Sequence, residues 1–156
     1  MGDPAGIGPE VIAKALADRA LTRLCTPVVV GSRPVMERTI AWLKLPLQVV
    51  DFNPSNGLRL KAGQVAVADP LESPLPKFRM GAATAVTGAA SIAFIKEAVT
   101  LAQAGSLGGI VTAPINKEAM NMAGFHYPGH TELLADLTKT TEFGMMIVGG
   151  PLKIMF

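Results

Sequence analysis

Cysteine and aromatic residues are scarce in this sequence. Its 156 residues include a single cysteine, Cys25, and aromatic side chains make up only 5%. One cysteine cannot close an intramolecular disulfide, which indicates a reduced, cytoplasmic compartment. Because apolar residues flank Cys25 in "LTRLCTPVVV" and no histidine is near it in sequence, we expect a buried, unreactive thiol.

Charge of either sign is also limited. Charged residues make up 17% of the chain, the formal net charge is +2, and the basic residues are scattered rather than clustered. This distribution argues against nucleic acid as a partner. No stretch approaches the roughly 18 consecutive apolar residues of a membrane span, and the first residues lack the basic and apolar regions of a signal peptide. We therefore expect no membrane partner.

Hydrophobic residues, in contrast, make up 49% of the chain, in short runs that alternate with helix-like segments. This alternation predicts an α/β fold with an at least partly parallel sheet. The predicted strands lie within residues 26–32, 46–52, 64–70, 107–114, 143–150 and 152–156. The predicted helices lie within residues 8–18, 34–45, 81–105, 115–124 and 129–140. Residues 53–64 are predicted as loop or hairpin, and residues 71–81 as an exposed, proline-rich excursion.

The ends of the sequence carry an expectation about its extent. A glycine-rich turn that leads into a helix usually follows a strand, and here the chain begins at the turn. The last predicted strand runs to Phe156 without a polar tail. We therefore expect this chain to be part of a longer protein.

The loop "GDPAGIGPE", residues 2–10, leads into the first predicted helix. Backbone N–H groups in such a loop can hold an anion at a helix N-terminus. The loop lacks the Gly-Lys-Ser/Thr of a P-loop, and Gly6 and Gly8 lack the third glycine of the dinucleotide fingerprint. A tight turn and a ligand-binding loop both remain open interpretations. Asp3 can carry a charge into a cleft or cap the turn.

The segment "GIVTAPINKEAM", residues 109–120, places polar side chains just beyond a predicted strand, Gly109–Ala113, that ends at Pro114. In open α/β sheets, ligands bind at the carboxyl ends of strands. Asn116 and Lys117 are therefore candidate cleft residues. Lys117 can neutralise a phosphate or carboxylate or remain a solvated surface residue, and Asn116 can cap the next helix or reach the ligand.

Both histidines of the chain lie four residues apart in "AGFHYPGHTELLAD". Pro128 and Gly129 stand between them and break a helix, so the geometry of a helical metal pair does not apply. We expect His126 to be a surface or packing residue, and Gly129 to be the bend before a helix that His130 and Thr131 open. Thr131 can cap that helix and His130 can project into a cleft, where both suit an anionic substrate. A capping threonine beside a structural histidine is the alternative.

Three motifs in this order, "GDPAGIGPE", "VTAPINKEAM" and "GFHYPGHTELLA", closely resemble the 4-hydroxythreonine-4-phosphate dehydrogenase family of pyridoxal phosphate biosynthesis. The resemblance covers essentially the whole chain, and G-H-T-E after T-A-P-x-x-K is its most specific part. It implies an α/β/α architecture like that of isocitrate and isopropylmalate dehydrogenases, with two lobes around a cleft, in a homodimer. It also implies NAD- or NADP-dependent oxidation of 4-phosphooxy-threonine, a small phosphorylated hydroxy amino acid, assisted by a divalent metal such as Zn, Mg or Co. The resulting β-keto acid can then lose carbon dioxide.

The resemblance assigns substrate contacts to His130 and Thr131 and places Lys117 near the cleft. The family's metal-binding histidines and most of its nucleotide contacts come later than Phe156. Residues 1–156 are therefore expected to form the N-terminal portion of a longer two-lobed dehydrogenase, with the lobe boundary between residues 105 and 130. Alone, this portion should hold no metal and be inactive. The alternatives are a relative that oxidises threonate phosphate, erythronate phosphate or a dihydrodiol, and a non-catalytic ligand-binding module.

Overall fold

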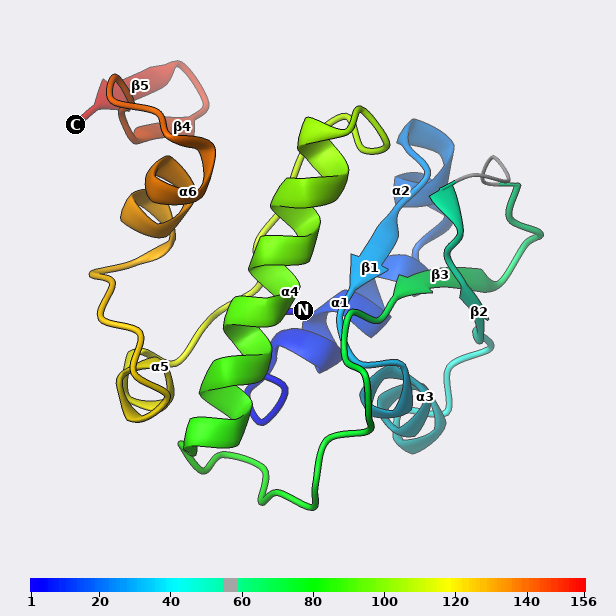
Figure 1. Cartoon of the computed structure of the whole chain (residues 1–156). Coiled ribbons are helices and arrows are strands. Elements are labelled where there is room, and N and C mark those ends of the chain that lie inside the picture. Colours follow the sequence, from blue (N-terminus) through cyan, green and yellow to red (C-terminus); the bar gives the residue numbers. More distant parts are fainter. Residues whose placement is uncertain (55–58) are drawn as a thin grey trace. The chain divides into compact units, whose positions relative to one another are not determined.

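The computed structural model describes residues 1–54 and 59–156 and divides the chain into two compact units, Met1–His126 and Tyr127–Phe156. Part of the predicted loop at 53–64 lies outside the described residues. The first unit contains five helices and three strands among its described residues (Figure 1). In chain order these are α1 (Gly8–Ala17), α2 (Arg19–Leu24), β1 (Val28–Val30), α3 (Arg33–Trp42), β2 (Gln48–Asp51), β3 (Gln64–Ala68), α4 (Ala85–Gln103) and α5 (Lys117–Met122).

The three strands of the first unit form one parallel sheet in the order β1-β3-β2. Val28 pairs with Ala66 across the first ladder, and Gln48 pairs with Gln64 across the second. All three strands are short, β-branched runs bounded by turn residues, as the sequence predicted. The parallel arrangement of the predicted α/β fold is therefore confirmed for this unit.

Helices cover both faces of this sheet, which gives the first unit three layers. Alternate side chains of β3 point to opposite faces, so Val65 and Val67 pack with α1 and α3, whereas Ala68 packs with α4. The first core includes Met36 of α3, and the second includes Phe94 of α4, which is 1% exposed. Each face of the sheet is therefore shielded from water by helices.

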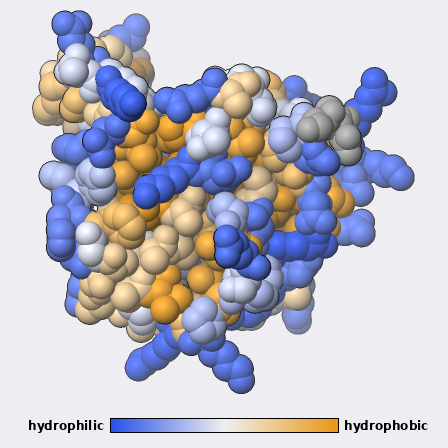
Figure 2. Space-filling model, in the orientation of Figure 1, coloured by the Kyte–Doolittle hydropathy of each residue, from blue (hydrophilic) through white to orange (hydrophobic). Residues whose placement is uncertain are grey.

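Helix α4 is the longest helix of the described residues, at 19 residues. The Thr84 side chain caps its start by accepting a hydrogen bond from the Thr87 N–H at 3.2 Å. By length and composition alone this helix could cross a membrane, although we expected no such segment. About half of it (56%) is buried within the protein, so its apolar character is that of a core helix. Figure 2 shows orange to pale orange surface over much of α4, interrupted by blue surface, in line with its alanine-rich sequence.

The second unit consists of α6 (His130–Thr138) and an antiparallel hairpin of β4 (Met146–Gly149) and β5 (Leu152–Met155). The two residues of the turn are Gly150 and Pro151, and Gly150 has a φ of 55°, which suits a tight hairpin turn. Every residue of the two strands is exposed. Both strands were predicted from sequence, and the hairpin confirms them.

The expected burial of Cys25 is wrong. Cys25 follows the end of α2, a short helix that the sequence did not predict, and its thiol is exposed. Leu24, its apolar neighbour, is 84% exposed, and strand burial begins only at Val29. Apolar neighbours in the sequence therefore did not provide a buried environment in space.

Candidate functional site

The carboxyl edge of the sheet in the first unit gathers the glycine-rich loop and several polar side chains. Because the three strands are parallel, their carboxyl ends lie at one edge. The N-terminal loop reaches this edge, where the α-amino group of Met1 donates a hydrogen bond to the Val30 carbonyl at 2.7 Å. Burial lowers the pKa of this amino group from 8.0 to about 6. In an open α/β sheet this is the edge where ligands bind.

Asp3 shapes the loop and is almost fully buried, with 4% of its surface exposed. Its Oδ1 accepts a hydrogen bond from the Ala5 N–H at 2.9 Å, and its backbone carbonyl accepts one from Gly6 at 3.0 Å. This is the turn-capping role that the sequence allowed. The Asp3 N–H also donates to the Pro114 carbonyl at 3.0 Å, which ties the loop to the segment before α5.

The predicted buried strand at Gly109–Ala113 is wrong. These residues form no strand within the described ranges, and Val111 is fully exposed, at 101% of the reference area. An apolar run becomes a buried strand only where a neighbouring strand completes its hydrogen bonds. Among the described residues no strand pairs with it, so the apolar pattern misled the assignment.

Asn116 and Lys117 begin the next helix as predicted. The Asn116 Oδ1 accepts a hydrogen bond from the Ala119 N–H at 3.0 Å, so Asn116 is the N-cap of α5. Lys117 is the first residue of α5 and is exposed. The capping role of Asn116 is confirmed, and a ligand role for Lys117 stays a prediction.

His130 and Thr131 open α6 in the second unit, also as predicted. The expected cap by Thr131 is wrong, because Gly129 holds the N-cap position and no side chain caps the helix. Across the turn, the Tyr127 hydroxyl donates a hydrogen bond to Asp136 Oδ2 at 2.6 Å, which raises the pKa of Tyr127. This bond holds the residues before α6 against the helix.

His130 is half-buried, and its Nε2 is buried without a hydrogen-bond partner among the described residues. Burial lowers the pKa of His130 below its ordinary value, so the neutral imidazole prevails at neutral pH. Buried polar atoms in proteins almost always have a partner, and an unpaired one calls for an explanation such as a ligand. His126, in contrast, is exposed and contacts Asn121 Oδ1 at 3.2 Å, which confirms its surface role.

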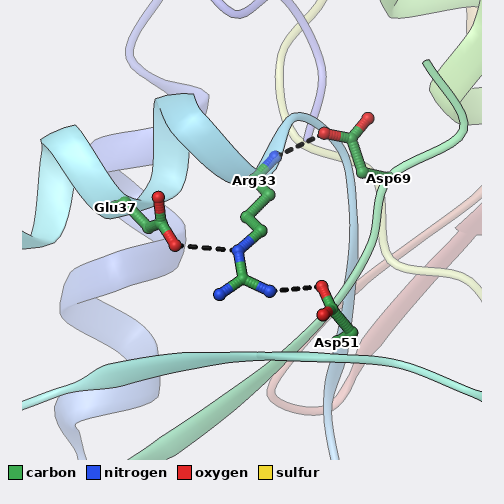
Figure 3. A network of polar contacts seen from close by, with 4 residues as sticks. All are labelled: Arg33, Glu37, Asp51 and Asp69. Carbon is green, nitrogen blue, oxygen red and sulfur yellow. Dashed lines mark hydrogen bonds and ion pairs between the residues drawn. The ribbon is translucent and has the colours of Figure 1, made fainter. Parts of the chain in front are cut away.

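A polar network that the sequence did not single out joins the same carboxyl edge (Figure 3). The Arg33 N–H donates to Asp69 Oδ2 at 2.8 Å, and its guanidinium donates to Glu37 at 2.8 Å and to Asp51. These hydrogen bonds, first that to Asp51, raise the pKa of Arg33. Arg33 follows β1, Asp51 ends β2 and Asp69 follows β3. Each of these three residues lies at or next to the end of a predicted strand. That position was the sequence feature that could have identified them.

Within residues 1–54 and 59–156, no group of three or more His, Cys, Asp or Glu side chains is placed to hold a metal ion. The described residues therefore do not fit a resident metal.

Comparisons with known proteins match nearly the whole chain to one protein family. The family model "Pyridoxal phosphate biosynthetic protein PdxA" matches residues 23–156. A 4-hydroxythreonine-4-phosphate dehydrogenase of Trichlorobacter lovleyi is 37% identical over 99% of this chain and 46% of its own length. A D-threonate 4-phosphate dehydrogenase of Pectobacterium atrosepticum is 40% identical over 99% of this chain and 48% of its own length.

Solved structures show the same similarity. The crystal structure of a 4-hydroxythreonine-4-phosphate dehydrogenase from Burkholderia phymatum superimposes with a TM-score of 0.89 at 37% identity. The match covers 99% of this chain and 47% of that one. The chain thus spans about half the length of the relatives that it matches.

Proposed function

Because the chain belongs to the family of the pyridoxal phosphate biosynthetic protein PdxA, we propose that it forms part of a dehydrogenase that uses NAD or NADP to oxidise a small phosphorylated hydroxy acid. The preferred substrate is 4-phosphooxy-threonine, whose oxidation gives a β-keto acid that then decarboxylates. The similarity of 99% of this chain to proteins named for that reaction carries the proposal. By this proposal, the protein acts in the cytoplasm, in the biosynthesis of pyridoxal phosphate.

The proposed architecture is that of isocitrate and isopropylmalate dehydrogenases, with two lobes in a homodimer. This chain supplies the N-terminal portion of that architecture, and the lobe boundary falls within residues 105–130. Two observations support this assignment. The first unit has three α/β/α layers, and the chain matches 47% of the Burkholderia phymatum structure.

His130 and Thr131 are the proposed substrate contacts of this chain. The buried Nε2 of His130 lacks a partner among the described residues, so a substrate hydroxyl or phosphate oxygen would satisfy it. The lowered pKa keeps the ring neutral at neutral pH, and a neutral imidazole can both accept and donate a hydrogen bond. Lys117 is a further candidate for binding the phosphate through its positive charge, and Asp3 and Asn116 each cap the backbone of their own segment.

The described residues contain no group of three or more side chains placed to hold a metal ion, so they do not supply the complete ligand set for the divalent metal of this reaction. No step through the metal is therefore assigned to this chain. The proposed work of its residues is to bind and orient the substrate. By the same argument, the chain alone should show no substrate-dependent reduction of NAD or NADP, and measurable reduction would contradict this division of roles.

A relative that oxidises threonate 4-phosphate is the second candidate function. The Pectobacterium atrosepticum protein of that name is 40% identical to this chain. Sequence identity is therefore about equal to relatives named for either substrate, and it does not decide between the two. Erythronate phosphate and dihydrodiols are further substrates to compare. A non-catalytic ligand-binding module would bind these compounds without oxidising them.

The decisive experiment uses a polypeptide that carries this sequence and extends to the full length of its relatives. The rate of NADH or NADPH formation with 4-phosphooxy-threonine and with threonate 4-phosphate identifies the substrate. His130→Ala should reduce turnover strongly and leave the metal content nearly unchanged. His126→Ala is the matched control and should change neither quantity, since that side chain is exposed. Loss of one metal equivalent in His130→Ala would show that His130 is a metal ligand and refute the assignment.

A further inference from the structure

A pocket of about 750 Å³ lies at the amino edge of the sheet in the first unit, opposite to the edge that carries Asp3. Its walls come from the ends of α1 and α2 and from residues 25–27 that lead into β1. The two residues before Gln48 of β2 and residues 59–65 that enter β3 complete them. A volume of this size is within the range of small-molecule sites. Neither the proposed substrate residues nor the Arg33 network line it.

The charged residues that line this pocket are all basic. They are Arg23, Arg59 and Lys61, and among the described residues no aspartate or glutamate lines the pocket. None of the three forms an ion pair within the described ranges. Asp18 follows a lining residue, and its carboxylate, which accepts the Ala20 N–H at 2.8 Å, offsets at most one of these three positive charges. Three unpaired positive charges around one cavity favour an anionic occupant.

Helix ends oppose this charge only in part. The carboxyl ends of α1 and α2 contribute to the wall, and each helix end carries about half a negative charge. Three full positive charges therefore outweigh them. Because Arg23, Arg59 and Lys61 are exposed, the attraction should weaken as salt is added.

The remaining wall is mostly apolar. Leu16 and Val65 are buried at 8% and 2% exposure, and Leu47, Leu60 and two prolines complete it. Inorganic phosphate would leave this apolar surface in contact with water, whereas a ring or alkyl chain would cover it. The pocket therefore combines a positive rim with an apolar wall.

We propose that this pocket binds a small anion with an apolar body, namely an aryl or alkyl phosphate or carboxylate. The anionic group lies among Arg23, Arg59 and Lys61, and the apolar body lies against Leu47 and Leu60. This binding site is additional to the proposed substrate site, and it does not depend on the dehydrogenase assignment.

Cys25 provides the measurement, because it lines the pocket, is exposed and is the only cysteine of the sequence. Its rate of alkylation by iodoacetamide therefore reports occupancy of the pocket in the 156-residue chain. Phenyl phosphate should slow alkylation in a saturable manner, and added salt should weaken this protection. Benzyl alcohol, which lacks the charge, and inorganic phosphate, which lacks the apolar body, should protect much less.

The variant Arg59→Gln/Lys61→Gln should weaken protection by phenyl phosphate roughly fivefold, since each exposed charge pair contributes modestly. Lys77→Gln/Lys153→Gln removes two positive charges that do not line the pocket and is the matched control, which should leave protection unchanged. The far-ultraviolet circular dichroism of each variant checks folding. The proposal is overturned if phenyl phosphate gives no protection, if benzyl alcohol or inorganic phosphate protects equally, or if the Arg59/Lys61 variant keeps the original affinity.

Discussion

Gly88 should be the most sensitive position in the contact between α4 and α5. A Cβ atom added at Gly88 would lie 1.9 Å from the backbone carbonyl oxygen of Ala119 and 2.7 Å from the backbone N of Met120. Both neighbours are backbone atoms of α5, and both residues are buried. The substitution Gly88→Ala therefore cannot be accommodated by rotating a side chain, and α5 must move away from α4.

Two effects of opposite sign determine the size of the change. Replacing glycine by alanine inside a helix stabilises it by about 1 kcal/mol. Overpacking a buried contact typically costs about 1–3 kcal/mol and occasionally more. A contact at 1.9 Å is far below any real Cβ contact, so the cost should lie at the upper end. We expect a net loss of about 1–2 kcal/mol, or roughly 2–8 °C in Tm for a chain of this size.

Urea unfolding followed by circular dichroism measures this loss. The midpoint for Gly88→Ala should fall while the slope stays unchanged, because the same surface is exposed on unfolding. Gly108→Ala is the control, since a Cβ there would meet nothing within 4 Å and its φ is not positive. It should unfold within about 0.5 kcal/mol of the parent chain. If Gly88→Ala were as stable as the parent or more stable, helix propensity would dominate and the close approach of α5 to α4 would be refuted.

Two further predictions concern the same unit. Asn116→Ala removes the cap of α5 and should lower the free energy of unfolding by about 1 kcal/mol, measured by urea unfolding against Asn116→Asp, which keeps a capping oxygen and should retain most of the stability. Burial lowers the pKa of the Met1 amino group to about 6, so the unfolded chain binds more protons between that value and 8.0. Stability should therefore rise by roughly 2–3 kcal/mol as the pH increases from about 5 to about 9. N-terminal acetylation removes this titrating group and should flatten this part of the pH profile of stability. An unchanged profile after acetylation would contradict the prediction.

Local patterns in the sequence were sufficient to predict most of the helices and strands. The three strands of the parallel sheet are β-branched runs that end at turn residues, and the start of α5 follows from Asn116 and its reach to Ala119. These features depend on residues only a few positions apart. The sequence therefore predicted them without knowledge of the tertiary structure.

Features that depend on distant partners could not be predicted in the same way. The run around Val111 has the composition of a strand, but pairing needs a second strand that composition does not specify. Cys25 is exposed because the chain leaves α2 there, which its apolar neighbours did not reveal. The ion pair of Arg33 with Asp51 requires the strand order β1-β3-β2, which brings the ends of separate strands together.

The two edges of the sheet also differ in charge, and this difference limits what each edge can bind. The Arg33 network holds three carboxylates and one guanidinium, so its net charge is −3 + 1 = −2. A phosphorylated substrate would be repelled by this network, which argues that the network fixes the strand ends and does not contact the substrate. Lys117, exposed at the start of α5, is the residue of this unit that we propose for attracting the phosphate. At the amino edge the balance is reversed, since the described residues that line the pocket include three cations and no carboxylate. An anion that diffuses to the first unit should therefore be held at the amino-edge pocket in preference to the Arg33 network.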